Sequence, residues 1–282
     1  MTDPAPSGPP LTSPPDHPVT AVLGGGVMGE TVLAGLLRSG RPPEAVVVSE
    51  KDPDRARDLE ERHGVRALRA TDAVRGAATV VLVVKPQDLE ALLVEVAPAM
   101  APGQVVVSLA AGVGTAWLEQ RVPEGVAVVR VMPNTPATVD QGMAVVSGGA
   151  SAGEAHLAEA ESLMRGTGRV VRVPESQQDA ATALSGSGPA YVFLVVEAMV
   201  EAGVRLGLPR PTATELAVQT VLGAATMVHE TGTHPALLRE QVTSPGGTTA
   251  AALAVLEQHG LRAAFLDALA AARDRSRELA GG

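Results

Sequence analysis

The chain has 282 residues, of which 45% are hydrophobic and 1% aromatic, with a formal net charge of −9 and no cysteine. This length and hydrophobic content predict a globular protein that forms one large domain or two of ordinary size. The acidic charge and the scarcity of aromatic side chains argue against a nucleic-acid partner, which needs cationic and stacking groups. The absence of cysteine excludes disulfides and thiolate metal sites, and six scattered histidines without zinc-ligand spacing predict no metal site.

The first 18 residues contain seven prolines and no apolar run. This composition predicts a disordered tail over residues 1–18, because it offers nothing to bury, and it does not fit a signal peptide. Further along, the longest apolar run, AYVFLVV, ends at Glu197, short of the ~18 uncharged residues that we require for a membrane span. We therefore expect a soluble, cytoplasmic protein without a membrane partner.

Residues 19–174 alternate short valine-rich runs with helical stretches. The valine-rich runs are VTAVLG, AVVVSE, ATVVLVVKP, QVVVSLAAG, VAVVRVMPN, MAVVSGG and GRVVRV. Nearly continuous aliphatic strands separated by helices are typical of a parallel sheet that is buried on both faces. The sequence predicts an α/β fold for this region, namely a Rossmann-type doubly wound sheet.

Residues 175–282 lose the strand pattern and show helical periodicity instead. We expect helices over 189–206, 212–229, 248–259 and 261–279. Several of these are apolar nearly all round, which a small helical domain cannot bury alone. The second domain is therefore predicted to be all-helical and to form a homodimer or a higher homo-oligomer. The alternative is a tight monomer whose helices pack against the sheet domain.

A glycine-rich loop follows the first strand and opens a helix, with the spacing Gly-x-Gly-x-x-Gly at Gly24, Gly26 and Gly29. The first glycine allows a tight turn, the second lets the backbone approach a pyrophosphate, and the third lets helix and strand pack closely. The amides at the helix start favour the phosphates. The strand–loop–helix–strand order predicts a dinucleotide site.

The second strand ends in Ser49, Glu50 and Lys51. At this point of such domains an acidic side chain binds the ribose 2′-hydroxyl of NADH, whereas a cation accepts the 2′-phosphate of NADPH. Glu50 and Lys51 therefore favour opposite cofactors, and two solvated charges at a strand end are an equally good interpretation.

Four further motifs stand where strands or helices end. VVKPQ at 83–87 contains one of the two lysines of the chain, SLAAGV at 108–113 is built of small residues, RVMPNTP at 130–136 breaks a strand, and LSGSGPAYVF at 184–193 opens the long apolar helix. Taken singly, each could be an ordinary turn or a surface feature.

Together with VTSPGGTTAA at 242–251, these motifs resemble the pyrroline-5-carboxylate reductases in their order and spacing. The resemblance covers about residues 19–269. It implies reduction of the cyclic imine 1-pyrroline-5-carboxylate to proline, the last step of proline biosynthesis, with NADPH as cofactor and NADH also accepted. The cofactor residues that it implies are Gly24, Gly26, Val27, Met28, Gly29, Ser49, Glu50, Lys51, Val83, Val84, Lys85, Pro86, Ala110, Ala111, Gly112 and Asn134.

The SPGGTT stretch also has a physical interpretation of its own. Ser244 can cap a helix whose first residue is Pro245, which leaves the amides of Gly247, Thr248 and Thr249 free to hold a carboxylate. The plain alternative is a capped helix start, which does not explain the glycines and threonines. By resemblance, Thr249 is the catalytic residue and lies near the imine nitrogen, either as a proton donor or as an orienting group. The implied substrate-binding residues are Glu175, Ser244, Gly246, Gly247, Thr248 and Thr249.

Two other functions share part of this sequence pattern, and one feature argues against each. A β-hydroxyacid dehydrogenase shares the glycine loop, but by resemblance it needs a lysine from the helical half, and no lysine follows Lys85. A non-catalytic nucleotide-binding regulator would not need the intact substrate loop. One departure from the reductase pattern is Ala70, where the family often has asparagine on the adenosine side of the cofactor.

Overall fold

The computed structural model describes residues 18–280. The predicted tail over residues 1–18 therefore lies outside the described residues, apart from Pro18. The chain divides into two compact units: the first contains the residues up to Gly186 and those from Arg273 onwards, and the second is Ser187–Ala272.

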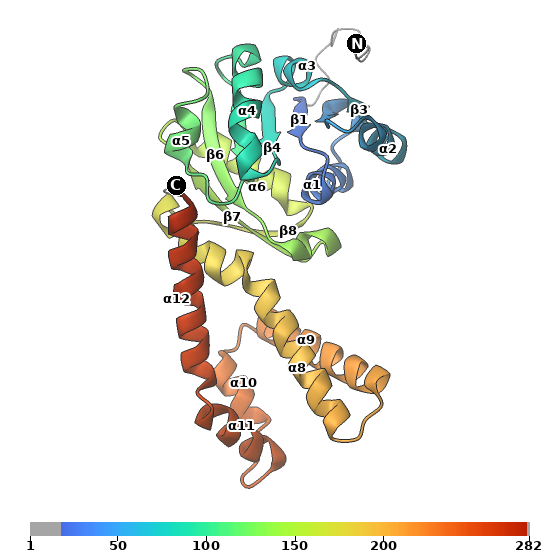
Figure 1. The fold of residues 1–282 in the computed structure, drawn as a ribbon, viewed down its shortest axis with the longest axis vertical. Helices are drawn as coiled ribbons and strands as arrows, with labels where there is room; N and C mark the ends of the chain where they lie inside the picture. Colours follow the sequence, from blue (N-terminus) through green and yellow to red (C-terminus); the bar gives the residue numbers. More distant parts are fainter. Residues whose placement is uncertain (1–17, 281–282) are drawn as a thin grey trace. The chain divides into compact units, whose positions relative to one another are not determined.

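The first unit is built on one sheet of eight strands in the order β3-β2-β1-β4-β5-β6-β7-β8 (Figure 1). All neighbouring strands are parallel except β6 and β7, which run antiparallel. A parallel pair needs a crossover of a dozen residues or more, and the segment between these two strands, residues 133–141, is shorter than that. The strands are β1 (Thr20–Leu23), β2 (Val46–Ser49), β3 (Arg66–Ala67), β4 (Thr79–Leu82), β5 (Val105–Ser108), β6 (Ala127–Met132), β7 (Gly142–Gly148) and β8 (Gly168–Arg172).

The Rossmann-type prediction is confirmed, with two differences in detail. The sequence pattern predicts a wholly parallel sheet and misses both the antiparallel pair and the edge strand β3. Strand β3 has only two residues, too few for an alternating pattern to be recognised.

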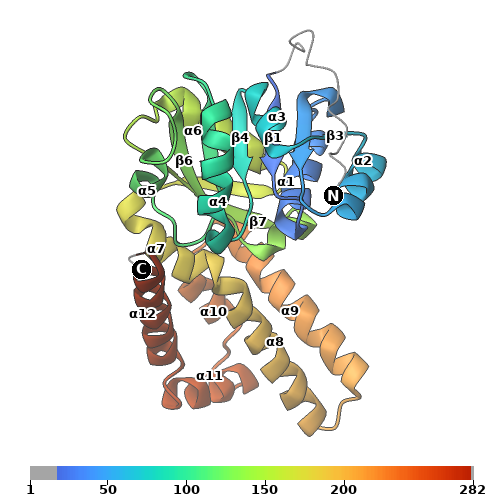
Figure 2. The same cartoon turned by 45° about the horizontal axis from the view of Figure 1, so that its top comes forward.

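Helices cover both faces of this sheet, as both views of the fold show (Figure 2). The α-helices of the first unit are α1 (Val27–Arg38), α2 (Pro53–His63), α3 (Ala70–Arg75), α4 (Pro86–Val96), α5 (Thr115–Glu119), α6 (Glu154–Arg165) and α7 (Gln178–Ala181). Short turns of other helical types are η1 (Pro43–Ala45), η2 (Ala97–Ala99), η3 (Thr135–Val139), η4 (Glu175–Gln177) and the π-helical η5 (Thr182–Gly186).

The strands supply two separate cores, because successive side chains point to opposite faces of a sheet. Val80 and Leu82 of β4 pack with α3 and α4 on one face, and Val81 packs with α1 and α6 on the other. All three side chains are fully buried. Burial on both faces explains why the strands read as unbroken aliphatic runs.

The second unit contains only helices: α8 (Gly188–Arg205), α9 (Arg210–Thr231), α10 (Pro235–Gln241), α11 (Thr248–Gln258) and the first part of α12 (Leu261–Ala280). The all-helical prediction is confirmed. Among the α-helices after residue 174, the sequence pattern misses the short α7 and α10. Helices α8 and α9 lie side by side. Their buried core is small and consists of Val200, Ala213 and Ala217.

The helical stretch 175–205 is, within residues 18–280, the one segment long and apolar enough to cross a membrane by length and composition alone. The sequence criterion above is stricter, because it admits no charge, and Glu197 interrupts the run. Only 11% of the most apolar window of this stretch is buried. An apolar helix with so little cover needs a partner surface.

Candidate functional site

The glycine loop takes a shape that other residues would not allow. Gly24 has φ +108°, and a Cβ added to it would lie 2.8 Å from the carbonyl oxygen of Val83. Its amide donates to the carbonyl of Ser49 at 2.8 Å, which ties the loop to β2. A Cβ on Gly29 would lie 1.9 Å from the carbonyl oxygen of Gly24. The loop therefore requires glycine at both ends, as the spacing predicts.

The loop leads directly into the N-terminus of α1. Gly26 is the N-cap, with no side-chain capping bond, and a Cβ there would meet no heavy atom within 4 Å. The next residues, Val27 and Met28, begin the helix, so their amides have no acceptor one turn earlier. Open space in front of such amides suits a pyrophosphate, which also benefits from the positive end of the helix dipole.

A cavity of about 610 Å³ opens beside this loop. It lies at the carboxyl ends of β1, β2 and β4, where the strand order reverses, which is the position at which doubly wound sheets bind their ligands. Its lining residues are Leu23, Gly24, Gly26, Ser49, Glu50, Lys51, Arg69, Ala70, Thr71, Val83, Val84, Lys85, Asp88, Leu92 and Glu95. The structure thus brings eight of the predicted cofactor residues together, those at the ends of the three strands.

Glu50 makes contacts that the sequence does not reveal. Its Oε2 accepts the amide hydrogen of Gly25 at 2.7 Å, and its Oε1 accepts those of Lys51 at 2.7 Å and Asp52 at 3.1 Å. The carboxylate therefore fastens the glycine loop to the end of β2.

A second carboxylate, Glu30, holds α1 against α2. It is bound by Arg55, Arg62 and His63 of α2. Burial by itself would raise the pKa of Glu30, but the hydrogen bonds from His63 and Arg55 and the two arginine charges lower this pKa to about 2. Arg55 also donates to the carbonyl of Gly25 at 2.9 Å. The ion pairs of Glu30 therefore help to hold the glycine loop in its shape.

The other predicted cofactor residues do not line the cavity. Gly29 packs against the loop, and Pro86 is the first residue of α4. Residues 110–112 follow β5, where Ala110 is buried and Gly112 has φ +76°. Asn134 is committed to structural bonds, because it donates to the Ser185 carbonyl at 3.1 Å and accepts from the Met143 amide at 2.8 Å.

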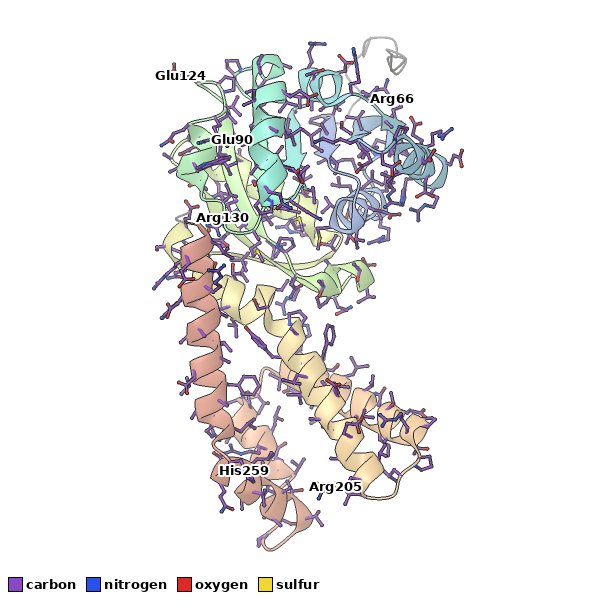
Figure 3. All side chains as sticks on the ribbon, viewed as in Figure 1. Arg66, Glu90, Glu124, Arg130, Arg205 and His259 are labelled. Carbon is purple, nitrogen blue, oxygen red and sulfur yellow. The ribbon has the colours of Figure 1, made fainter. Side chains whose placement is uncertain are left out.

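Glu175, predicted to touch the substrate, is held within the first unit. Its Oε1 accepts from the amide of Thr115 at 2.7 Å, the Thr115 hydroxyl donates to its other oxygen, and Arg130 donates at 3.4 Å. Arg130, labelled in Figure 3, belongs to β6. Its side chain is buried, and its Nη2 has no hydrogen-bond partner among the residues described. This arrangement connects β6, α5 and η4.

The predicted substrate loop adopts a turn rather than the expected capped helix start. The amide of Gly247 donates to the carbonyl of Ser244 at 3.0 Å, and Gly246 has φ +68°. With Pro245 in the second position, these are the features of a type II turn. Helix α11 begins at Thr248 with Gly247 as N-cap. Proline followed by a left-handed glycine favours the turn over an earlier helix.

The later start changes which amides are available. Gly247 uses its amide within the turn, so the expectation of a free Gly247 amide is wrong. Thr248 and Thr249 are the first two residues of α11, and amides at these positions have no intrahelical acceptor. Thr249 is half-buried and Thr248 is exposed. The loop belongs to the second unit and the cavity to the first.

Several lining residues escape the sequence reasoning. Arg69 and Thr71 lie at the start of α3, and Asp88, Leu92 and Glu95 lie on α4. Arg69 was detectable in principle, because it follows a strand at the same sheet edge as Ser49. That strand, β3, is too short to recognise from its pattern.

The residues of this cavity fit a dinucleotide. Gly26 leaves open space in front of the α1 amides, and the volume is within the range of ~300–1,000 Å³ usual for ligand sites. Among residues 18–280, no group of three or more histidine, aspartate and glutamate side chains is placed to hold a metal ion. A doubly wound sheet with this loop and cavity at its switch point defines the class as dinucleotide-binding oxidoreductases.

Comparisons with known proteins narrow this class. Residues 175–279 match the family described as pyrroline-5-carboxylate reductase dimerisation, and residues 19–112 match NADP oxidoreductase coenzyme F420-dependent. The pyrroline-5-carboxylate reductase of Mycobacterium leprae is 45% identical over 92% of this chain and 96% of its own.

Comparison with solved structures leads to the same family. A pyrroline-5-carboxylate reductase from Coxiella burnetii superposes with a TM-score of 0.89 at 39% identity, over 93% of this chain and 98% of its own. The Plasmodium falciparum pyrroline carboxylate reductase, solved with NADP bound, has a TM-score of 0.83 at 25% identity, over 94% and 99% of the two chains. The chain belongs to the pyrroline-5-carboxylate reductase family.

Proposed function

We propose that this protein reduces 1-pyrroline-5-carboxylate to L-proline with a hydride from NADPH or NADH, as the last step of proline biosynthesis. The observation that carries the proposal is the glycine loop bordering an open cavity, in a chain that matches a pyrroline-5-carboxylate reductase over 92% of its length. The match to the dimerisation family begins at residue 175 of this chain. This supports a cofactor domain over 19–174 and a substrate and dimerisation domain over 175–282.

The chain's own residues then have distinct tasks. The loop Gly24–Gly29 and the α1 N-terminus hold the pyrophosphate, and Ser49, Glu50, Lys51 and Val83–Lys85 surround the rest of the nucleotide. The dinucleotide, when bound, supplies the hydride. The loop residues Ala110–Gly112, together with Pro86 and Asn134, remain in this proposal as supports of the cofactor site on family grounds.

The substrate is assigned to the turn and helix start at residues 244–249. The amides of Thr248 and Thr249 at the first turn of α11 suit a carboxylate, while Ser244, Gly246 and Gly247 shape the turn. The Thr249 hydroxyl orients the imine nitrogen. A protonated imine accepts a hydride at its carbon without further activation. The reaction balances because the imine, one proton and one hydride together give the amine. Orientation therefore supplies most of the rate enhancement.

Glu175 has the same family-based assignment as a residue at the substrate ring, and its contacts qualify that role. Both carboxylate oxygens already accept hydrogen bonds from Thr115. We therefore propose that Glu175 acts through its position in the wall formed by β6, α5 and η4, and not as a proton donor.

The proposal extends to assembly and location. We propose a cytoplasmic homodimer or higher oligomer that forms through the helical half and binds neither nucleic acid nor membrane. The uncovered apolar surface of the stretch 175–205 and the dimerisation family match support a second copy of the chain as its partner. The negative net charge supports the absence of a nucleic-acid partner, and the lack of cysteine supports a cytoplasmic location.

The purified protein should oxidise NADPH only when pyrroline-5-carboxylate is present, and it should form proline in equal amount. Treatment with a chelator should leave the rate unchanged, since the chemistry asks for no metal. A protein that forms no proline under these conditions, or that needs added zinc to do so, contradicts the proposal.

A further inference from the structure

The end of the cavity beside β2 and β3 carries both signs of charge. Glu50, Lys51 and Arg69 all line it. Strands β3, β2 and β1 are neighbours in the sheet, and α3 follows β3 in the chain. Sequence reasoning assigns the choice between NADH and NADPH to Glu50 against Lys51. The contacts in the structure change that assignment.

Glu50 is largely committed to the protein backbone. A carboxylate has about four acceptor positions, and three of them are taken by the amides of Gly25, Lys51 and Asp52 at 2.7 to 3.1 Å. Three amide dipoles that point at the carboxylate also offset part of its negative charge. The main role of Glu50 is therefore to hold the glycine loop in place. Its repulsion of a nearby phosphate is weakened.

Arg69 is paired with an aspartate, but its side chain remains accessible to a ligand in the cavity. Its Nε donates to Asp72 Oδ2 at 2.9 Å, its Nη2 lies 2.9 Å from the same oxygen, and Arg75 donates to Asp72 Oδ1 at 3.0 Å. The Arg69 side chain is 54% exposed, so its ion pair with Asp72 contributes little and a phosphate in the cavity can compete for the guanidinium. Because Arg75 keeps its own bond, Asp72 does not lose its compensating charge when Arg69 turns away.

We propose that Arg69, with Lys51 as a weaker second cation, binds the 2′-phosphate of the cofactor and so sets the preference for NADPH over NADH. A guanidinium binds phosphate through two parallel hydrogen bonds, which a lysine ammonium cannot do. This inference rests on the proposed function, since it names the part of the cofactor site that distinguishes the two dinucleotides.

The test measures binding of two nucleotides that differ only in the phosphate, namely 2′,5′-ADP and 5′-AMP, by calorimetry. In Arg69→Ala the affinity ratio of 2′,5′-ADP to 5′-AMP should fall about tenfold or more, and in Lys51→Ala about two- to fivefold. Arg69→Lys should recover part of the ratio. The control is Arg57→Ala, which removes an exposed arginine of α2 that neither lines the cavity nor pairs with Asp72, and it should leave both affinities within about twofold.

Kinetics supply an independent reading. The ratio of kcat/KM for NADPH to that for NADH should fall in Arg69→Ala in parallel with the binding ratio. An unchanged binding ratio in Arg69→Ala overturns the inference, as does an equal loss of both nucleotides. Failure of the proposed function looks different: the wild-type protein would then bind nucleotides but form no proline from pyrroline-5-carboxylate.

Discussion

The two units of this protein treat their apolar surface in opposite ways. In the first, the strands and the helices on either face bury two large aliphatic clusters. In the second, the buried cluster consists of Val200, Ala213 and Ala217, while Phe193 and Leu194 of α8 are 64% and 66% exposed. The comparison teaches that the first unit completes its core within one chain and that the second depends on association.

The strongest test of this comparison places charge on the exposed face of α8. Phe193→Asp combined with Leu194→Asp should remove about 3–6 kcal/mol of apolar burial from a dimer interface, which corresponds to roughly 10²–10⁴-fold weaker association. Light scattering at micromolar concentration should show a monomer.

A matched control for this variant exists on the first unit. Val94 of α4 is 74% exposed, so Val94→Asp changes an equally open apolar side chain and should leave the oligomer intact. The comparison fails if the wild type is itself a stable, active monomer.

The second test uses one added methyl group in each unit. Gly29→Ala places a Cβ 1.9 Å from the Gly24 carbonyl oxygen, so it should destabilise the first unit by about 3 kcal/mol or more and abolish nucleotide binding. Gly223→Ala in α9 meets no heavy atom within 4 Å, and alanine in a helix should stabilise by about 0.5–1 kcal/mol. Thermal unfolding with and without nucleotide measures both. A loss of assembly in Gly223→Ala would place that residue in the interface.

The third test separates the roles of the two units in catalysis. Thr249→Ala should lower kcat by roughly five- to 150-fold, the equivalent of about 1–3 kcal/mol for one lost hydrogen bond. Its KM for NADPH should not change, since the cavity that we assign to the cofactor belongs to the first unit. Wild-type turnover in Thr249→Ala, with Thr249→Ser as the conservative comparison, removes the hydroxyl from the mechanism.

The smallest expected effect concerns pH and again only the first unit. The pKa of Glu30 is about 2 in the folded protein against 4.5 for the unperturbed group. The unfolded chain therefore takes up this proton first, and the stabilisation is present above about pH 4.5 and is lost as the pH falls towards 2. Partial exposure and screening reduce its size to about 1 kcal/mol.

The variant Glu30→Gln should remove this part of the acid dependence. Urea unfolding between pH 3 and pH 7 measures it, with the helical half as the internal reference. An unchanged slope of stability against pH in Glu30→Gln contradicts the assignment.

The sequence predicts the elements around the cavity of the first unit well because their signals are local. The glycines of the loop are required by backbone clashes within a few residues, and the ends of β1, β2 and β4 meet at one edge by the rules of parallel sheets. The order of these elements is therefore enough to bring Gly24, Ser49 and Lys85 to one cavity.

The parts that sequence reasoning misses depend on contacts between distant residues or on very short elements. Glu50 reads as a specificity residue until its bond to Gly25 is seen. Arg69 follows a strand of two residues. The stretch at 244–247 carries signals for a helix start and for a type II turn, and only the left-handed Gly246 decides between them.

The bonds that Glu50 makes to the loop have a kinetic consequence. They are formed by the protein alone, so the glycine loop already has its binding shape before any nucleotide arrives. Cofactor capture then requires no prior loop closure, and its association rate should follow diffusion and the local charge rather than a slow isomerisation. Stopped-flow traces of NADPH binding should accordingly show a single phase whose rate rises linearly with cofactor concentration.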